Sequence, residues 1–176
     1  MRVTNLAGTK MNYHQGDVVV HHNFGVGKVD TVETKTADGE LRLYYRVSFD
    51  KTTVWVPVRN PSKRVLRRIT PKRDLFRYRT LLKSTPEMLD TDFYKRQDAL
   101  EKRVHSGTYQ GLCEAVRDLS AHADRKALTY SEKNFLRKSL DALISEWSIT
   151  SGVSFDEAYN EIDGYLRKSR NLPSPA

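Results

Sequence analysis

The stretch GDVVVHHNFGVGKVDTVETKT, residues 16–36, decides how the first part of the chain folds. Three β-branched residues, Val18 to Val20, follow a glycine and an aspartate, as at the start of a strand. From Thr31 to Thr36, β-branched and polar residues alternate, which is the pattern of a strand with one buried side. The stretch therefore predicts strands over residues 17–21, 25–29 and 31–36.

The residues that follow extend the same pattern. Asp38-Gly39 predicts a tight hairpin, because both residue types tolerate a positive φ. Two more β-rich segments, residues 41–47 and 52–57, supply further strands. Five short strands with tight turns predict a small SH3- or Tudor-like β-barrel over residues 12–70.

Around Thr70 the pattern of apolar residues changes from every second residue, as in a strand, to every third or fourth residue, as in a helix. Thr70-Pro71 reads as a cap followed by proline at the first helical position. Helices are expected from there, over about 92–105 and 108–122, and after the capping boxes that begin at Thr129 and Ser154. The predicted fold class is α+β, with a β-barrel followed by a compact all-helical domain over residues 71–170.

The two ends fit neither pattern. Residues 1–11 are expected to be a disordered extension, with Met11 as an alternative natural start, and residues 171–176 a disordered tail. No apolar segment is long enough for a membrane span or a secretory signal. With one cysteine, Cys113, and so no internal disulfide, the chain is expected to be cytoplasmic.

Charge is distributed unevenly along the chain. The formal net charge is +8, and a basic chain favours a polyanionic partner, because neutralising phosphates releases counterions. Residues 59–79 hold nine Lys or Arg and one acid, whereas residues 141–170 hold six acids and three bases. The latter segment is therefore a poor candidate for contact with phosphate.

No pattern indicates an enzyme. Phe24-Gly-Val-Gly-Lys28 is not a Walker A motif, because His22 stands where a glycine is required and Val29 where Ser or Thr is required. Adjacent histidines in a strand, His21 and His22, are expected to point to opposite faces, so no metal site is predicted. Cys113 has helical spacing from Val116 and is expected to pack in the core.

Residues 13–69 resemble the RNA-polymerase-interacting domain shared by CarD/CdnL regulators and transcription-repair coupling factor. The matching features occur in order: Gly16-Asp-Val-Val-Val-His21, Phe24-Gly-Val-Gly-Lys-Val29, the Asp38-Gly39 hairpin, Val54-Trp-Val-Pro-Val58 and Val65-Leu-Arg-Arg-Ile69. The helical half resembles CarD alone, in Ala99-Leu-Glu-Lys102, Ser106-Gly107, Glu114-Ala-Val-Arg-Asp-Leu119 and Leu128-Thr-Tyr-Ser-Glu-Lys133.

The resemblance implies a monomeric, nucleoid-associated transcription regulator without catalytic residues or cofactor. Such proteins bind the β subunit of RNA polymerase, in the holoenzyme with the housekeeping sigma factor, through the barrel. Their helical domain contacts promoter DNA at the upstream edge of the melted bubble and stabilises the open complex.

Matched positions place Lys35 and Trp55 at the polymerase-facing surface. Relatives often carry arginine where Trp55 stands, so stacking would here replace a salt bridge. Core packing is the alternative for Trp55, but Val54 and Val56 must point to the opposite side and are better core residues.

On the helical domain the resemblance implies that Phe93 is an apolar wedge in the minor groove, with Lys95, Arg96 and Lys133 on phosphates. Tyr94 is the other candidate for the wedge, and in that case Phe93 would cap the helical core. Asp98 stands where relatives often carry a base. Two alternative functions stay open: a polymerase-binding scaffold or antagonist that does not contact DNA, and an RNA- or ribosome-binding barrel protein.

Overall fold

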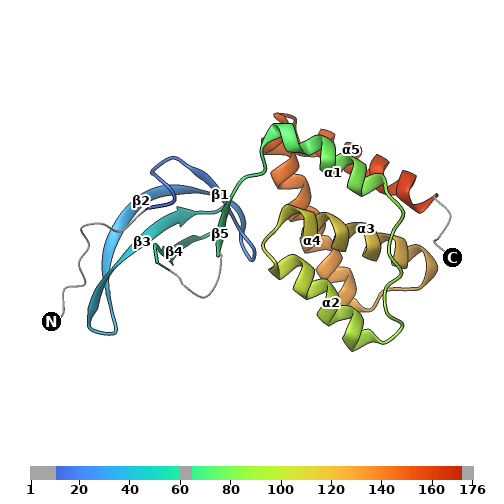
Figure 1. The fold of residues 1–176 in the computed structure, drawn as a ribbon, viewed down its shortest axis with the longest axis horizontal. Coiled ribbons are helices and arrows are strands. Elements are labelled where there is room, and N and C mark those ends of the chain that lie inside the picture. The colour runs from blue at the N-terminus through green and yellow to red at the C-terminus, as the bar shows by residue number, and fades with distance from the viewer. Residues whose placement is uncertain (1–10, 60–64, 172–176) are drawn as a thin grey trace. The chain divides into compact units, whose positions relative to one another are not determined.

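A computed structural model describes residues 11–59 and 65–171 (Figure 1). Of the predicted terminal extensions, all but Met11 and Asn171 lie outside the described residues. The chain divides into two compact units between Ile69 and Thr70. Each unit has a hydrophobic core of its own.

The first unit is a five-stranded antiparallel sheet. Its strands in sheet order are β4 (Thr53–Pro57), β3 (Glu40–Ser48), β2 (Gly25–Ala37), β1 (Val18–His21) and β5 (Leu66–Arg68). Among the described residues no ladder joins β4 to β5, so the curved sheet is open there (Figure 1). The predicted class, a β unit followed by a helical unit, is confirmed.

The predicted strands differ from the observed ones in two places. Segments 25–29 and 31–36 are one strand, β2, whose register against β3 shifts between Val29 and Thr31. Asp30 forms this bulge, which interrupts the pairing without ending the strand. Strand β5 was not predicted as a separate strand. The Asp38-Gly39 turn is confirmed, with φ values of 51° and 76°.

Alternation along the strands separates a core face from an outer face. Val19, Val29 and Val47 are fully buried in the core. On β4, Val56 is 4% exposed and Trp55 is 40% exposed. The prediction that the valines rather than Trp55 face the core is confirmed.

The expected orientation of the two histidines is wrong. His21 is the last residue of β1, and His22 lies in the following turn, where strand alternation no longer applies. Their rings stack with centroids 4.6 Å apart. Burial, with a smaller contribution from His22, lowers the pKa of His21 to about 4, and its Nδ1 accepts a hydrogen bond from the Asn23 amide.

The second unit contains a 3-10 turn and five helices. They are η1 (Lys72–Asp74), α1 (Leu75–Lys83), α2 (Phe93–His105), α3 (Tyr109–Arg125), α4 (Tyr130–Ser151) and α5 (Phe155–Arg170). The capping boxes at Thr129 and Ser154 are confirmed. The cap predicted at Thr70 is wrong: its amide donates to Glu146, and its carbonyl accepts from the Thr150 hydroxyl. These two bonds instead attach the start of the unit to α4.

Helix α3 lies at the centre of this unit and contacts all four other helices. Its buried face includes Cys113 and Val116, both 0% exposed, and the packing role predicted for Cys113 is confirmed. Helices α1 and α5 lie side by side, and Figure 1 shows α2 away from them, beyond α3.

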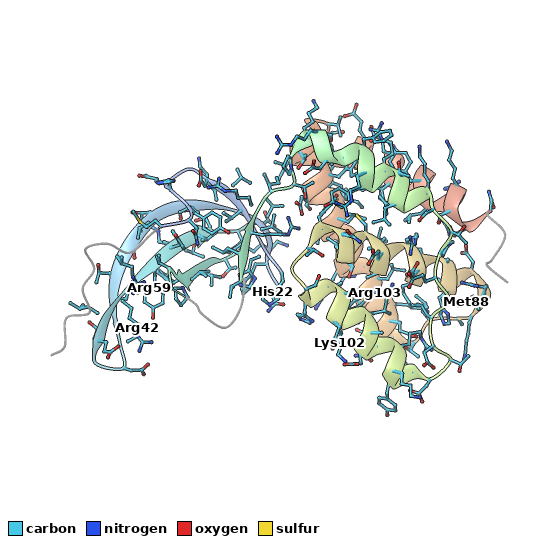
Figure 2. All side chains as sticks on the ribbon, in the orientation of Figure 1. His22, Arg42, Arg59, Met88, Lys102 and Arg103 are labelled. Atoms are coloured by element: carbon cyan, nitrogen blue, oxygen red, sulfur yellow. The ribbon has the colours of Figure 1, made fainter. Side chains whose placement is uncertain are left out.

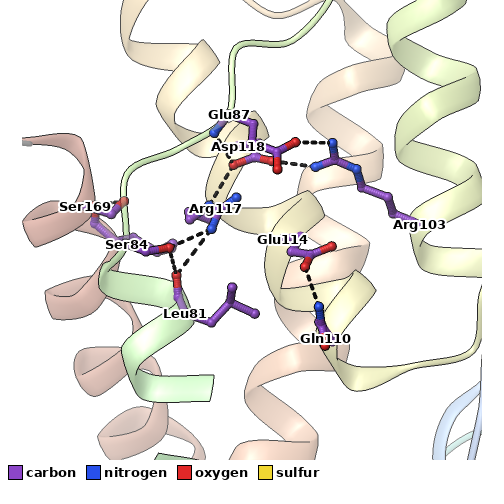
Figure 3. Close-up of polar contacts among 10 residues, drawn as sticks. Leu81, Ser84, Glu87, Arg103, Gln110, Glu114, Arg117, Asp118 and Ser169 are labelled. Carbon is purple, nitrogen blue, oxygen red and sulfur yellow. Dashed lines mark hydrogen bonds and ion pairs between the residues drawn. The ribbon is translucent and has the colours of Figure 1, made fainter. Parts of the chain in front are cut away.

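A buried carboxylate fastens the connection between α1 and α2 to α3. Asp118, 0% exposed, accepts from Arg117 Nε at 2.7 Å, from Arg103 Nη1 at 2.5 Å and from the Glu87 amide at 2.9 Å (Figure 3). Arg103 also pairs with Glu87 at 2.7 Å, and Arg117 donates to the Ser84 hydroxyl. Every charge in the cluster therefore has a partner of opposite sign.

Removing the carboxylate of Asp118 should destabilise the helical unit. Asp118→Ala leaves Arg117 buried without its carboxylate, and we expect a loss of about 3–5 kcal/mol in the free energy of unfolding. Urea unfolding followed by far-UV circular dichroism measures it.

Asp98→Ala is the matched control, because Asp98 and its partner Lys102, 2.6 Å away, are both exposed on α2. Figure 2 labels Lys102 on this helix. Its cost should stay within about 1 kcal/mol. Equal losses for the two variants would contradict the role given to Asp118.

Candidate functional site

The outer face of the sheet brings Lys35 and Trp55 together, although they lie on β2 and β4. The Lys35 ammonium is 3.4 Å from the centroid of the Trp55 ring. A cation over an indole face is attracted by the ring quadrupole, most strongly where water is excluded. Both residues predicted for polymerase binding thus form one contact in the free protein.

Two further residues hold this pair in place. Glu33 accepts from Trp55 Nε1 at 3.0 Å with one carboxylate oxygen and from Arg46 Nη1 at 3.1 Å with the other. Arg46 also lies 3.5 Å from Asp30, the bulge residue. We call Glu33, Lys35, Arg46 and Trp55 the outer cluster. Neither Glu33 nor Arg46 was predicted as a site residue, although period-two spacing places Glu33 on the same face as Lys35.

On the helical unit, the candidate wedge residues occupy the first turn of α2. The Asp92 side chain begins the helix by accepting from the Lys95 amide at 2.9 Å. Phe93 is half-buried, whereas Tyr94 is 80% exposed, and the two rings meet edge to face with centroids 5.3 Å apart. Of the two rings, Tyr94 presents the larger area to a partner.

Arg96 does not lie where the predicted phosphate contact needs it. Its side chain is 4% exposed, with Nε 2.7 Å from Glu132 and Nη1 donating to the Asp90 and Thr91 carbonyls. Burial tends to raise the pKa of Glu132, but hydrogen bonds from Thr129 and Arg96 outweigh it and hold that pKa low. Arg96 therefore joins the start of α2 to the start of α4.

This junction places four exposed residues at the ends of two neighbouring helices. Lys95 and Lys133 are exposed, and among the described residues neither ammonium has an ion pair. Tyr130, the first residue of α4, is 83% exposed. We call Phe93, Tyr94, Lys95, Tyr130 and Lys133 the helical tip. Tyr130 was missed, because a tyrosine inside a capping box gives no functional signal by itself.

Comparison with known proteins identifies both units. Residues 13–70 match the CarD-like/TRCF RID domain, and residues 78–163 match the CarD C-terminal domain. YdeB of Bacillus subtilis (strain 168), provisionally named a transcription factor, is 28% identical over 146 residues, which cover 79% of this chain and 92% of YdeB.

These two domains in this order define a transcription factor with an RNA-polymerase-interacting β domain followed by a helical domain. The chain belongs to the CarD family. No described helix is long and apolar enough to cross a membrane. In the described part of the chain, no three His, Cys, Asp or Glu side chains are grouped so that they could hold a metal ion.

The hydrogen bond that Trp55 Nε1 donates to Glu33 should fix the orientation of the indole ring. Glu33→Ala removes the acceptor for Nε1, so the indole should become more mobile and more easily quenched, whereas Glu33→Gln keeps an amide oxygen to accept that bond. Acrylamide quenching of tryptophan fluorescence measures the difference.

The other tryptophan, Trp147, is 0% exposed and should contribute a component that quencher does not reach. Trp55→Phe removes the fluorescence of Trp55, so it shows which component of the emission comes from each tryptophan. If the alanine variant quenches like the wild type, Glu33 does not position the ring.

Proposed function

We propose that this chain regulates transcription without catalysis, by binding the β subunit of RNA polymerase with the outer cluster and promoter DNA with the helical tip. The DNA contact would lie at the upstream edge of the melted bubble and stabilise the open complex. The chain would thus act in the cytoplasm, wherever polymerase holds a promoter. The observation that supports the polymerase contact is the match of residues 13–70 to the polymerase-interacting domain.

The geometry of the outer cluster suits a protein partner. Among the described residues β4, which carries Trp55, is an edge strand. The outer backbone groups of an edge strand can pair with a strand of another protein. Because Glu33 and Lys35 already fix the ring in the free protein, little side-chain freedom remains to be lost on binding. A rigid, partly exposed tryptophan is a frequent hot spot in protein interfaces.

The helical tip combines the two features that a DNA fork requires. An apolar or aromatic side chain can enter an opened base step and offset the cost of unstacking. Tyr94 and Phe93 supply rings, while Lys95 and Lys133 supply cations for the flanking phosphates. We propose Phe93, at the family position, and Tyr94, the more exposed ring, as a joint wedge. Arg96 supports it from below by fixing the start of α2.

Replacing Trp55 should weaken binding to polymerase without unfolding the protein. For Trp55→Ala we expect at least a thirtyfold loss of affinity for immobilised core polymerase, which corresponds to about 2 kcal/mol. Surface plasmon resonance with the full chain measures it.

Phe24→Ala is the control, because Phe24 is 45% exposed on the same unit but lies in the turn between β1 and β2. It should bind like the wild type. A Trp55→Ala variant of unchanged affinity would remove the outer cluster from the interface.

Replacing the tip rings should shorten the life of the open complex. Tyr94→Ala and Phe93→Ala should each remove about 1–3 kcal/mol of stacking, which makes decay about fivefold to 140-fold faster when a competitor traps the released polymerase. Affinity for polymerase should not change. The decay is measured on one promoter with each variant.

The melting temperature of each variant separates a wedge from a core residue. If Phe93→Ala melts several degrees lower than the wild type, and the open complex is short-lived only at temperatures where the variant is unfolded, then Phe93 caps the core. Tyr94 alone would then be the wedge. Unchanged lifetimes with both variants folded would favour the alternative function of a polymerase-binding scaffold that does not contact DNA.

A further inference from the structure

Helix α1 and the turn before it carry a second basic surface, separate from the helical tip. Lys72, Arg73, Phe76, Arg77 and Thr80 follow the spacing i, i+1, i+4, i+5, i+8, so they share one side of the helix. All five are exposed. The opposite side packs into the helical core through Leu75 and Leu82. We call the five exposed residues the α1 face.

The cations of the α1 face are largely free of acidic partners. Arg73, with its side chain 87% exposed, has one carboxylate nearby, Asp74, at 3.9 Å. Arg77 donates to the Gln110 side-chain oxygen at 2.6 Å, and Gln110 in turn donates to Glu114. Within the described ranges, neither Lys72 nor Arg77 forms an ion pair. Three cations on two helical turns are thus available to an anionic partner.

Phe76 gives this surface a second property. Its ring is 74% exposed, in the middle of the three cations, and it makes no contribution to the core. A single exposed apolar residue is common on protein surfaces and would need no explanation. An aromatic ring surrounded by cations, however, is the combination that binds nucleic acid, with the cations on phosphates and the ring on a base.

We propose that the α1 face is a second DNA-contacting surface, which binds the phosphodiester backbone without sequence preference and stacks Phe76 on an unpaired base. A membrane surface fits less well, because an interfacial helix needs a broad apolar face and this one exposes a single ring. Figure 1 shows α1 on the side of the helical unit away from α2, so the contact is additional to the helical tip and does not depend on it.

The salt dependence of binding gives the proposal a quantitative form. Each phosphate neutralised on duplex DNA contributes about 0.9 to the slope of log affinity against log salt, and about 0.7 on a single strand. Three cations of the α1 face should therefore contribute about 2 to 3 to that slope.

The test measures binding of the full chain to a short labelled duplex and to a single strand of equal length, by fluorescence anisotropy over a range of salt. The triple variant Lys72→Ala/Arg73→Ala/Arg77→Ala should bind the duplex at least tenfold more weakly at low salt, with a slope smaller by about 2 to 3. Phe76→Ala should weaken single-strand binding about fivefold or more, and duplex binding less.

A matched triple variant, Lys102→Ala/Arg137→Ala/Lys138→Ala, removes exposed cations of α2 and α4. Both triples lower the formal net charge from +8 by three, so they separate a local surface from total charge. Equal losses for the two triples, or no loss for the first, would overturn the proposal. Binding of each variant to anionic lipid vesicles is measured as well. The proposal would also be overturned if the first triple variant lost binding to these vesicles while its DNA binding stayed unchanged.

The same measurements in a Lys95→Ala/Lys133→Ala background keep this inference apart from the proposed function. An α1 effect of the same size in that background supports a separate surface, even where the tip substitutions themselves change nothing. An α1 effect that disappears in that background would mean that the two sets of cations act as one site, against the proposal.

Discussion

The buried ion pair between Arg96 and Glu132 is the constraint on which the helical tip depends. Taking two charges out of water is costly, and such a pair contributes little net stability compared with apolar residues of the same volume. What the pair supplies is position, because the guanidinium must reach both Glu132 on α4 and the carbonyls that precede α2. Two helix starts that are far apart in sequence are thereby held side by side, with Tyr94 and Tyr130 both exposed.

Much of the fold could be read from the sequence, because local chemistry decides it. The turn at Asp38-Gly39 follows from the tolerance of these residues for positive φ. The capping boxes at Thr129 and Ser154 follow from the need of the first helical amides for hydrogen-bond acceptors. The burial of Val56 follows from the alternation of side chains along a strand. Thr70 shows the limit of such reasoning. A threonine before a proline suits a helix cap, yet the backbone amide and carbonyl of Thr70 form hydrogen bonds to Glu146 and Thr150 on α4. Partners that lie this far along the chain cannot be predicted from the local sequence.

The candidate sites could be predicted only in part, because their residues were identified from the sequence but their contacts depend on the fold. Lys35 and Trp55 come from matched family positions, but their stacking depends on the register of β2, β3 and β4, which only the folded sheet sets. Arg96 reads as one more cation in a basic segment, whereas its partner Glu132 lies outside that segment. A side chain's charge is visible in a sequence; whether another element of the fold already neutralises it is not.

The two glycines of the Phe24–Lys28 segment, at the start of β2, are required for different reasons, and this limits how the segment can vary. Gly25 has a φ of 74°, so a side chain there would be strained although nothing obstructs it. Gly27 lies under the Phe49 ring, where an added Cβ would be 2.6 Å from a ring carbon and 2.7 Å from the Ser48 carbonyl oxygen. A substitution at one position would distort the backbone, and at the other it would push the aromatic ring out of the core. Backbone conformation at Gly25 and close packing at Gly27 are thus sufficient to explain why this segment holds two glycines.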